Sequence, residues 1–165
     1  MRKLTLMIGL FALVSMAIGQ NRLTPELLWE LDRVGAPTAS PDGKYIAFTV
    51  SDYDWKTNSS RTDIYFMSTK GGEAKKLTGE MTKSSWSPEW RSDSKYIGFM
   101  SANAGEPQMF ELEIENPTNY RQVTNQEGGI TGFHYSKAMN KVVYSTNVKL
   151  RETTVDKYPD LLYAT

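Results

Sequence analysis

The residues of this chain that could do chemistry are few, and their spacing does not assemble a catalytic site. Hydrolysis through a serine needs a nucleophile, a base and an oxyanion hole, and the nucleophile often lies in a Gly-x-Ser-x-Gly turn. No serine has glycines two positions before and after it, and the chain has one histidine, His134, and no cysteine. We therefore predict no catalytic residue, and interpret His134 as a partly exposed residue of a strand over residues 132–135.

The chain also has few side chains that could bind a metal or cofactor. Zinc and iron rarely bind to carboxylates alone, and one histidine without cysteines leaves little else. Asp52, Asp54 and Asn58 have a spacing that hints at calcium, but Lys56 stands where an oxygen ligand is needed. Gly128-Gly129 lacks the Gly-Lys-Ser/Thr of a phosphate loop. We predict no metal or cofactor site, and a solvated loop at residues 51–62.

Aromatic side chains are the remaining candidates for binding. Tyr53 and Trp55 lie in the same polar loop, where aromatics often contact ligands or partner domains. Packing against a neighbouring sheet is the alternative that general burial preferences favour. Trp86 and Trp90 lie four apart around Pro88 and are expected to belong to the core.

A β-repeat must position all of these residues. One copy runs from Ser40 to Phe48, a second from Arg91 to Phe99 follows 51 residues later, and a weaker third from Ser136 to Tyr144 follows after another 45. Repeats of about 40–50 residues with a turn and several short strands are typical of β-propeller blades, and a ring needs at least about four blades. The sequence predicts an all-β fold, a partial propeller of about three blades over residues 36–79, 80–125 and 126–165, the last incomplete.

The apolar pattern predicts which strand residues share a face. Residues two apart in a strand lie on the same side of a sheet. Each repeat has one such pair: Ile46 and Phe48, Ile97 and Phe99, and Val142 and Tyr144. The similar ends Leu77-Thr78 and Val123-Thr124, 46 residues apart, predict short closing strands.

The N-terminus has the pattern of an export signal. Arg2 and Lys3 precede the apolar stretch from Leu4 to Ala17, and Ala17-Ile18-Gly19 fits the small-x-small cleavage rule, so residues 1–19 are expected to be removed before Gln20. The stretch is short for a bilayer span of about 20 residues, although an uncleaved anchor is the alternative. Cleavage leaves 17 basic and 19 acidic residues. This balance argues against nucleic acid or an anionic membrane as a partner, and we expect a periplasmic or secreted protein.

A helix is expected between the signal and the repeats, over residues 20–35. Thr24 can cap it, and Pro25 suits its first position. One apolar stripe then follows at helical spacing: Leu27, Leu28, Leu31 and Val34. Gly35 and Pro37 are expected to end the helix, which would have to dock on a blade edge or on a second domain.

Several segments resemble the start of secreted bacterial dipeptidyl peptidases of the prolyl oligopeptidase family, in particular the dipeptidyl-peptidase V group. They are Leu23-Thr24-Pro25-Glu26, Ser-Pro-Asp-Gly-Lys at 40–44, Glu-Gly-Gly-Ile-Thr-Gly-Phe at 127–133 and Lys-Tyr-Pro-Asp at 157–160. The third turn, Ser136 to Met139, lacks the family's Pro-Asp. The end, Leu161 to Thr165, fits a further strand by pattern and an inserted loop by resemblance.

The resemblance implies an N-terminal propeller that caps a C-terminal α/β-hydrolase domain absent from this chain and restricts access to short peptides. The serine, aspartate and histidine of the parent would come from that domain, so this chain alone would be non-catalytic. Acidic residues on the propeller side hold the substrate amine in relatives. Five glutamates are conceivable, and none matches a motif: Glu26, Glu30, Glu106, Glu111 and Glu127.

Two other interpretations remain open. A free-standing periplasmic propeller of the TolB type, which binds a protein or glycan, would use the same blade motif. A chain that ends at Thr165 would expose an unpaired blade edge, and exposed edges promote pairing between molecules. In that case residues 20–165 are expected to be oligomeric or poorly soluble.

Overall fold

The computed structural model describes residues 23–138 and 141–148, and the chain divides into two compact units at residues 31 and 32. The first unit contains the single short helix of the described residues, α2 (Pro25–Glu30), capped by Thr24, whose Oγ1 accepts a hydrogen bond from the Leu27 amide at 3.2 Å. The helix is shorter than predicted. Leu31 already has an extended backbone, and Val34 pairs with Val50 in a sheet. No helix in the described part is long and apolar enough to cross a membrane.

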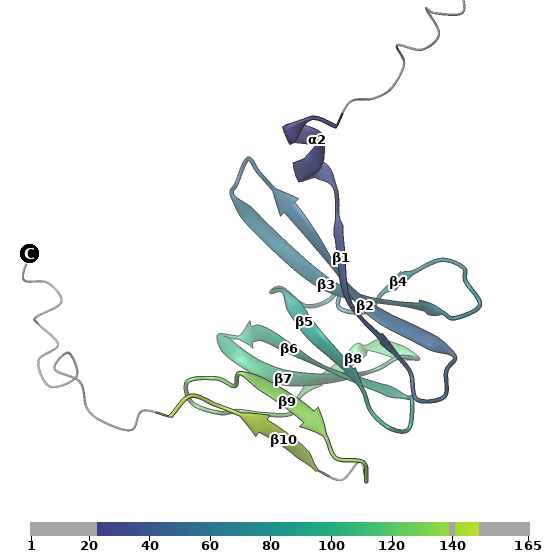
Figure 1. The fold of residues 1–165 in the computed structure, drawn as a ribbon. Coiled ribbons are helices and arrows are strands. Elements are labelled where there is room, and N and C mark those ends of the chain that lie inside the picture. Colours follow the sequence, from purple (N-terminus) through teal and green to yellow (C-terminus); the bar gives the residue numbers. More distant parts are fainter. Residues whose placement is uncertain (1–22, 139–140, 149–165) are drawn as a thin grey trace, which may run out of the picture. The chain divides into compact units, whose positions relative to one another are not determined.

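The second unit consists of antiparallel sheets in sequence order (Figure 1). Blade 1 contains β1 (Arg33–Ala39), β2 (Tyr45–Asp54), β3 (Ser59–Ser68) and β4 (Lys75–Lys76). Blade 2 contains β5 (Ser85–Trp90), β6 (Tyr96–Ala104), β7 (Glu106–Glu113) and β8 (Asn116–Gln122). The third blade contributes β9 (Gly132–Tyr135) and β10 (Val142–Ser145). The predicted all-β, incomplete propeller is confirmed, and its sheets do not close into a ring.

Element boundaries differ from the predicted ones in blade 1. The first strand begins at Arg33, inside the range expected to be helical. The expected loop at 51–62 is mostly a hairpin, because β2 and β3 pair without interruption from Tyr45–Ser68 to Asp54–Ser59. The predicted segments at 157–160 and 161–165 lie outside the described residues.

The turns of blades 1 and 2 have the same construction despite different residues. The Gly43 amide donates to the Ser40 carbonyl at 2.9 Å, and the Ser94 amide donates to the Arg91 carbonyl at 2.9 Å. Gly43 has a φ of 71° and Ser94 one of 60°. Serine therefore adopts, at some cost, the left-handed conformation that glycine adopts freely.

A bulge next to a proline separates the two tryptophans of β5. The pairing with β6 shifts between Trp86 and Glu89, at Pro88, just as β1 shifts between Gly35 and Thr38, at Pro37. A bulge adds one residue to a strand and reverses the faces that follow it. Trp90 therefore lies in the core between blades 1 and 2, whereas Trp86 packs against the core between blade 2 and the third blade.

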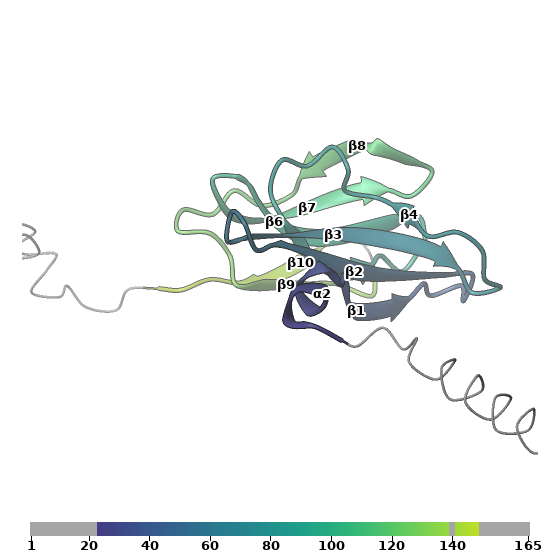
Figure 2. The same cartoon turned by 90° about the horizontal axis from the view of Figure 1, so that it is seen from above.

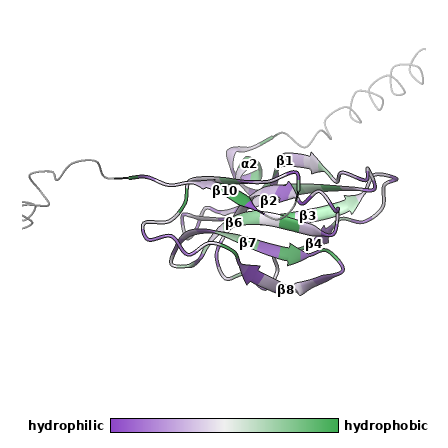
Figure 3. Cartoon of the chain, turned by 90° about the horizontal axis from the view of Figure 1, so that it is seen from below, coloured by the Kyte–Doolittle hydropathy of each residue, from purple (hydrophilic) through white to green (hydrophobic). Residues whose placement is uncertain are grey.

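Two apolar clusters join the blades. The first is formed by Ala47, Ile64, Leu77, Met81, Trp90, Ile97, Phe99, Phe110 and Leu112. The second is formed by Met100, Met109, Ile130 and Phe133, with Val142 packed against it. Strand β8 lies at the outer edge of blade 2 (Figure 2) and has mainly hydrophilic colours, as Figure 3 shows. The cores therefore lie between sheets, as a propeller requires.

A buried threonine follows the last strand of each complete blade. In blade 1, the Thr78 hydroxyl donates to Asp63 Oδ1 at 3.1 Å and accepts from the Ile64 amide at 3.0 Å. In blade 2, the Thr124 hydroxyl donates to Gln108 Oε1 at 2.8 Å and accepts from the Met109 amide at 2.9 Å. Each hydroxyl thus joins the end of the blade to its third strand through two bonds.

Replacing Thr124 by valine is expected to lower the free energy of unfolding by about 1–3 kcal/mol, because the buried Met109 amide loses its partner. Urea unfolding of the chain measures the change. Thr118→Val is the control, since its hydroxyl is exposed and bonds only to the exposed Asn116 side chain. Equal losses in the two variants would contradict this role for Thr124.

Stability is also expected to fall in acid through Asp63. Burial alone would raise the pKa of this carboxyl, but hydrogen bonds from Arg61 and Lys76 outweigh it and hold the pKa below its ordinary value. The unfolded chain therefore binds the proton more readily, so the contribution is present above about pH 4 and is lost as the pH falls further. Asp63→Asn is expected to be less stable at pH 7 and to lose less stability than wild type between pH 7 and pH 3.

Chemical denaturation at the two pH values gives the comparison. Glu73→Gln, in an exposed loop, is the control. If Asp63→Asn loses as much unfolding free energy as the wild type between pH 7 and pH 3, the acid sensitivity does not come from Asp63.

Candidate functional site

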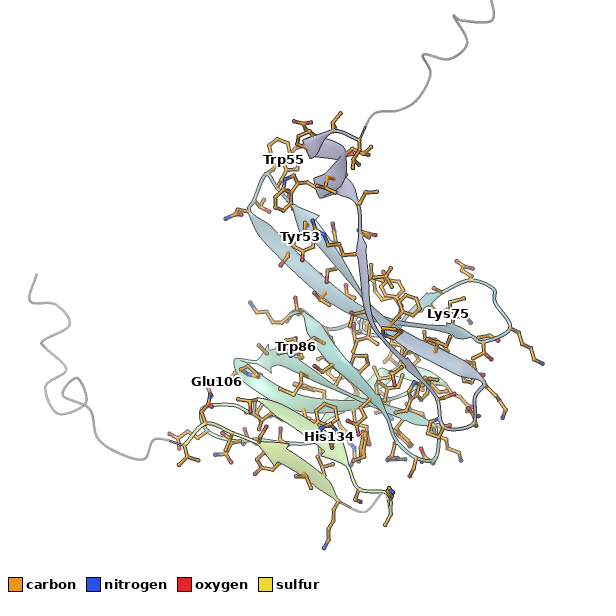
Figure 4. The ribbon with its side chains drawn as sticks, viewed as in Figure 1. Tyr53, Trp55, Lys75, Trp86, Glu106 and His134 are labelled. Carbon is orange, nitrogen blue, oxygen red and sulfur yellow. The ribbon has the colours of Figure 1, made fainter. Side chains whose placement is uncertain are left out.

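Blade 2 and the third blade meet at a carboxylate, Glu89, near the bulge of β5. Its Oε1 accepts a hydrogen bond from the Tyr135 amide at 2.9 Å, and its Oε2 lies 2.9 Å from His134 Nδ1. The two side chains line a cavity of about 570 Å³ together with Thr38, Ser87, Pro88, Gly132, Phe133, Val143, Tyr144 and Ser145. The His134 side chain is 84% exposed, and Figure 4 shows it on β9. The predicted strand position of His134 is confirmed, and its side chain is more exposed than the partial exposure predicted.

The chemistry of this cavity is that of a polar surface. Glu89 can accept hydrogen bonds or attract a cation, and His134 can carry a proton. Ser145 also lines the cavity, but its hydroxyl lies 2.8 Å from that of Thr131. Within residues 23–138 and 141–148, no hydroxyl hydrogen-bonds to His134, so the geometry described here does not contain a serine–histidine pair.

A second carboxylate, Glu111, is buried at the same junction. Its Oε1 accepts hydrogen bonds from Tyr135 at 2.8 Å and from Arg91 at 3.1 Å. Its Oε2 accepts two from Arg121, at 2.6 and 2.9 Å. Burial, followed by the charge of Glu111, raises the pKa of the Tyr135 phenol far above its ordinary value. Tyr135 therefore stays a hydrogen-bond donor, and Glu111, only 2% exposed, is occupied by protein groups.

The other glutamates considered for amine binding lie in different surroundings. Glu106 and Glu127 line one polar depression of about 330 Å³, together with Gln126. Glu26 and Glu30 are exposed on α2, in the other unit. Among the three candidates of the second unit, the structure brings Glu106 and Glu127 together.

The residues with calcium-like spacing form a hairpin turn. Asp54 Oδ1 accepts hydrogen bonds from the amides of Lys56 at 2.9 Å and Thr57 at 3.4 Å. Hydrogen bonding to Thr57 and then to Lys56 lowers the pKa of Asp54. Asn58 has a φ of 49°, and Asp52 pairs with Arg61 across the hairpin. No cluster of three potential metal-binding acids or histidines occurs among the described residues.

The aromatic residues of this hairpin do not both pack on a neighbouring blade as the favoured interpretation held. Trp55 is 57% exposed at the turn, and Figure 4 shows it at the tip of the hairpin. Tyr53 is half-buried, and the Arg33 guanidinium of its own blade lies 4.2 Å from its ring centre. That interpretation is wrong for Trp55, because β2 and β3 extend past the inter-blade core.

Sequence reasoning did not identify Glu89. Its signal was positional, because Thr38, Glu89 and His134 each lie two residues before the first turn residue of their repeat. Glu89 of blade 2 therefore lies next to His134, the residue at the equivalent position of the third blade, and their side chains are 2.9 Å apart.

Two curated relatives resemble this chain over most of its length. Dipeptidyl-peptidase 5 of Porphyromonas endodontalis is 35% identical over 141 residues, 86% of this chain, and that of Porphyromonas gingivalis is 38% identical over 145 residues, 88% of this chain. The chain spans only about a fifth of each, 20% and 21%. No family model matches the chain.

Solved structures show the same fold at low sequence identity. The acylaminoacyl peptidase of Pyrococcus horikoshii aligns with 71% of this chain and 17% of its own, with a TM-score of 0.58 and 14% identity. The propeller domain of the trilobed protease from Pyrococcus furiosus covers 72% of this chain and 35% of its own, at 0.55 and 15%. A putative TolB from Agrobacterium tumefaciens covers 78% of this chain and 42% of its own, at 0.53 and 23%.

The fold is that of a β-propeller segment, as in the solved structures. Over the matched residues the chain is a homologue of dipeptidyl-peptidase 5. The resemblance predicted from the sequence motifs is confirmed.

Removing the Tyr135 hydroxyl tests the junction around Glu111. Tyr135→Phe keeps the ring, which contacts Phe133 edge-on, but removes a hydrogen bond to a buried carboxylate, so a loss of about 1.5–3 kcal/mol in unfolding free energy is expected. Tyr144→Phe, whose exposed hydroxyl lies 3.4 Å from Gln126, is the matched control. If both variants unfold at the wild-type denaturant midpoint, Tyr135 does not hold the junction.

Proposed function

We propose that this chain is the N-terminal propeller part of an exported serine dipeptidyl or oligopeptidase. In this proposal it gates the access of peptides to a C-terminal α/β-hydrolase domain outside the chain and is itself non-catalytic. The observation that carries the proposal is the identity of 35–38% to dipeptidyl-peptidase 5 over 86–88% of this chain. The match spans about a fifth of each relative, so a parent protein of the same length would have room for further domains.

The architecture supports a gating role. Its blades pack face to face through two apolar clusters, and more blades are needed before a ring can close. A closed propeller has a narrow central channel, which admits an extended peptide more readily than a folded protein. The inner-strand side chains of Glu89, which is half-buried, and His134, which is exposed, supply polar groups for the wall of such a channel.

Export is part of the proposal. Its support is the sequence pattern of residues 1–19, a short basic segment followed by an apolar one and a small-x-small site. The balanced charge of the remainder agrees with a periplasmic or secreted enzyme that acts on peptides.

A TolB-like binding propeller is the second candidate, supported by the TM-score of 0.53 to the putative TolB from Agrobacterium tumefaciens. At 23% identity this likeness concerns the fold alone. The two candidates predict different sequences beyond Thr165, because a binding propeller would continue with blades and no hydrolase domain.

The test starts with the coding sequence beyond Thr165 and continues with its product. We expect further blades and then a Gly-x-Ser-x-Gly turn, and release of dipeptides from chromogenic dipeptidyl substrates by the longer product but not by the 165-residue chain. Alanine at the elbow serine is the control. Gating further predicts that short peptides are cleaved and folded proteins are not. A longer product without hydrolase sequence or peptidase activity would favour the binding propeller.

A further inference from the structure

The hairpin between β2 and β3 is longer than the equivalent hairpin of blade 2. Sixteen residues lie between Phe48 and Tyr65, which pair across it. Ten residues lie between Phe99 and Phe110, the pair at the same place in blade 2. The additional length puts Trp55 at the tip (Figure 4), with more than half of its surface in solvent. The hairpin therefore carries a large aromatic side chain away from the core that joins the blades.

Hydrogen bonds hold this tip in a defined conformation. Asp54 Oδ1 accepts from the amides of Lys56 and Thr57, and the Thr57 hydroxyl lies 2.8 Å from that of Ser59. The Lys56 ammonium lies 5.8 Å from the centre of the Trp55 ring. An aromatic side chain on an ordered support loses little conformational freedom when it binds, and tryptophan is enriched among the residues that dominate interfaces. The tip thus has the properties of a preformed binding element.

The strand order determines what lies at this end of the blade. Arg33, the first residue of β1, pairs with Ser51 beside the hairpin, so the chain enters blade 1 at the hairpin end. In blade 2, β8 ends at Gln122, and the Val123 amide then donates to the Met109 carbonyl, on the side of the β6–β7 turn. Each complete blade therefore receives and releases the chain at the end where its second and third strands are joined. A domain that follows a last blade of this construction is attached at that same end.

We propose that the β2–β3 hairpin is a docking arm whose Trp55 inserts into an apolar pocket of a C-terminal domain of the same polypeptide. The proposal rests on the proposed function, because it requires a hydrolase domain after the propeller, and the relatives are about five times the matched length. The pocket must also offer a hydrogen-bond acceptor, since a buried indole N–H usually finds one. The shorter hairpin of blade 2 has Gly105 at its turn, so blade 2 offers no equivalent anchor.

Thiol labelling measures whether the tip is covered. The 165-residue chain has no cysteine, so Lys56→Cys introduces a single thiol beside Trp55. Glu73→Cys, in the exposed loop between β3 and β4 at the opposite end of the blade, is the matched control. Both variants are labelled with a maleimide in the 165-residue chain and in the longer product, with site-resolved mass spectrometry. We expect the thiol at position 56 to react at least about tenfold more slowly in the longer product, and the thiol at position 73 to react equally in both.

The role of the tryptophan is tested in the same longer product. Adding Trp55→Ala to Lys56→Cys is expected to raise the labelling rate at position 56 at least about tenfold, because an anchor residue carries a large share of the binding energy. Ser60→Ala, at an exposed position of the same hairpin, is the control and is expected to leave the protection intact. A photoreactive cross-linker attached to the thiol at position 56 identifies the partner, and we expect its cross-links to fall in the hydrolase sequence.

Other outcomes overturn the proposal. Equal reactivity at position 56 in both proteins would mean that nothing covers the tip, even if the peptidase assay succeeds. Protection that survives Trp55→Ala would exclude this residue as the anchor, and cross-links to later blades would exclude the hydrolase domain as the partner. Protection of the 165-residue chain that grows with its concentration would identify a second copy instead. A protected tip cross-linked to a C-terminal domain without peptidase activity would sustain the docking arm and remove only the proposed function.

Discussion

The integrity of each complete blade depends on one buried threonine hydroxyl. The closing strand β4 has only two residues, so its backbone ladder is too short to hold the end of blade 1 in place. Thr78 compensates by bonding both the Ile64 amide and the Asp63 carboxylate, and Thr124 repeats the arrangement with Met109 and Gln108. Without the hydroxyl the buried amide would remain unsatisfied, at a cost of about 1–3 kcal/mol. The acceptors would keep another donor, Arg61 at Asp63 Oδ1 and the Gln126 amide at Gln108 Oε1. The threonine bonds fix the position at which the chain passes from one blade to the next.

The two junctions use the same positions with different chemistry. In the first, Trp90 stacks on Tyr45 with ring centres 6.4 Å apart, and Tyr45 contacts Phe66 at 5.7 Å. In the second junction, Tyr135 occupies the position of Trp90, and Glu111 occupies the position of Phe66. The aromatic contact is therefore replaced by a hydrogen bond from the Tyr135 hydroxyl to Glu111, whose carboxylate also binds Arg91 and Arg121. Burying that carboxylate is tolerable because four donor atoms surround it. The two junctions therefore use equivalent backbone positions, but one contact is aromatic and the other is polar.

Much of the fold could be predicted because its signals repeat. The turns at Gly43 and Ser94, the apolar strands after them and the ends at Thr78 and Thr124 all lie at similar offsets, so each copy supports the others. The bulges gave no comparable signal. Trp86 and Trp90 were both expected in the core, but their spacing around Pro88 did not indicate that they would lie in different cores. The predicted helix was too long because Val34 fits the apolar stripe of a helix as well as it fits a strand. Only its pairing with Val50 shows that it belongs to a strand. Glu89 and Glu111 are ordinary acids in the sequence, and their hydrogen-bond partners come from residues 10 to 46 positions away.

The same contacts limit what this part of the protein can recognise. Asp63 is held by Arg61, Lys76 and Thr78, and Glu111 by Arg91, Arg121 and Tyr135, so neither of these buried carboxylates can take a ligand without losing structural bonds. Accessible acids near depressions include Glu89, beside His134, the pair Glu106 and Glu127, and the group Asp42, Asp93, Glu113 and Glu115. Because charges near a surface act strongly only at short range, recognition of a cation or an amine by these blades must draw on such side chains. Glu89 already bonds to the Tyr135 amide and to His134, so a ligand there would compete with the junction itself. Binding at Glu89 and docking of the third blade are therefore physically linked, through a single carboxylate that serves both.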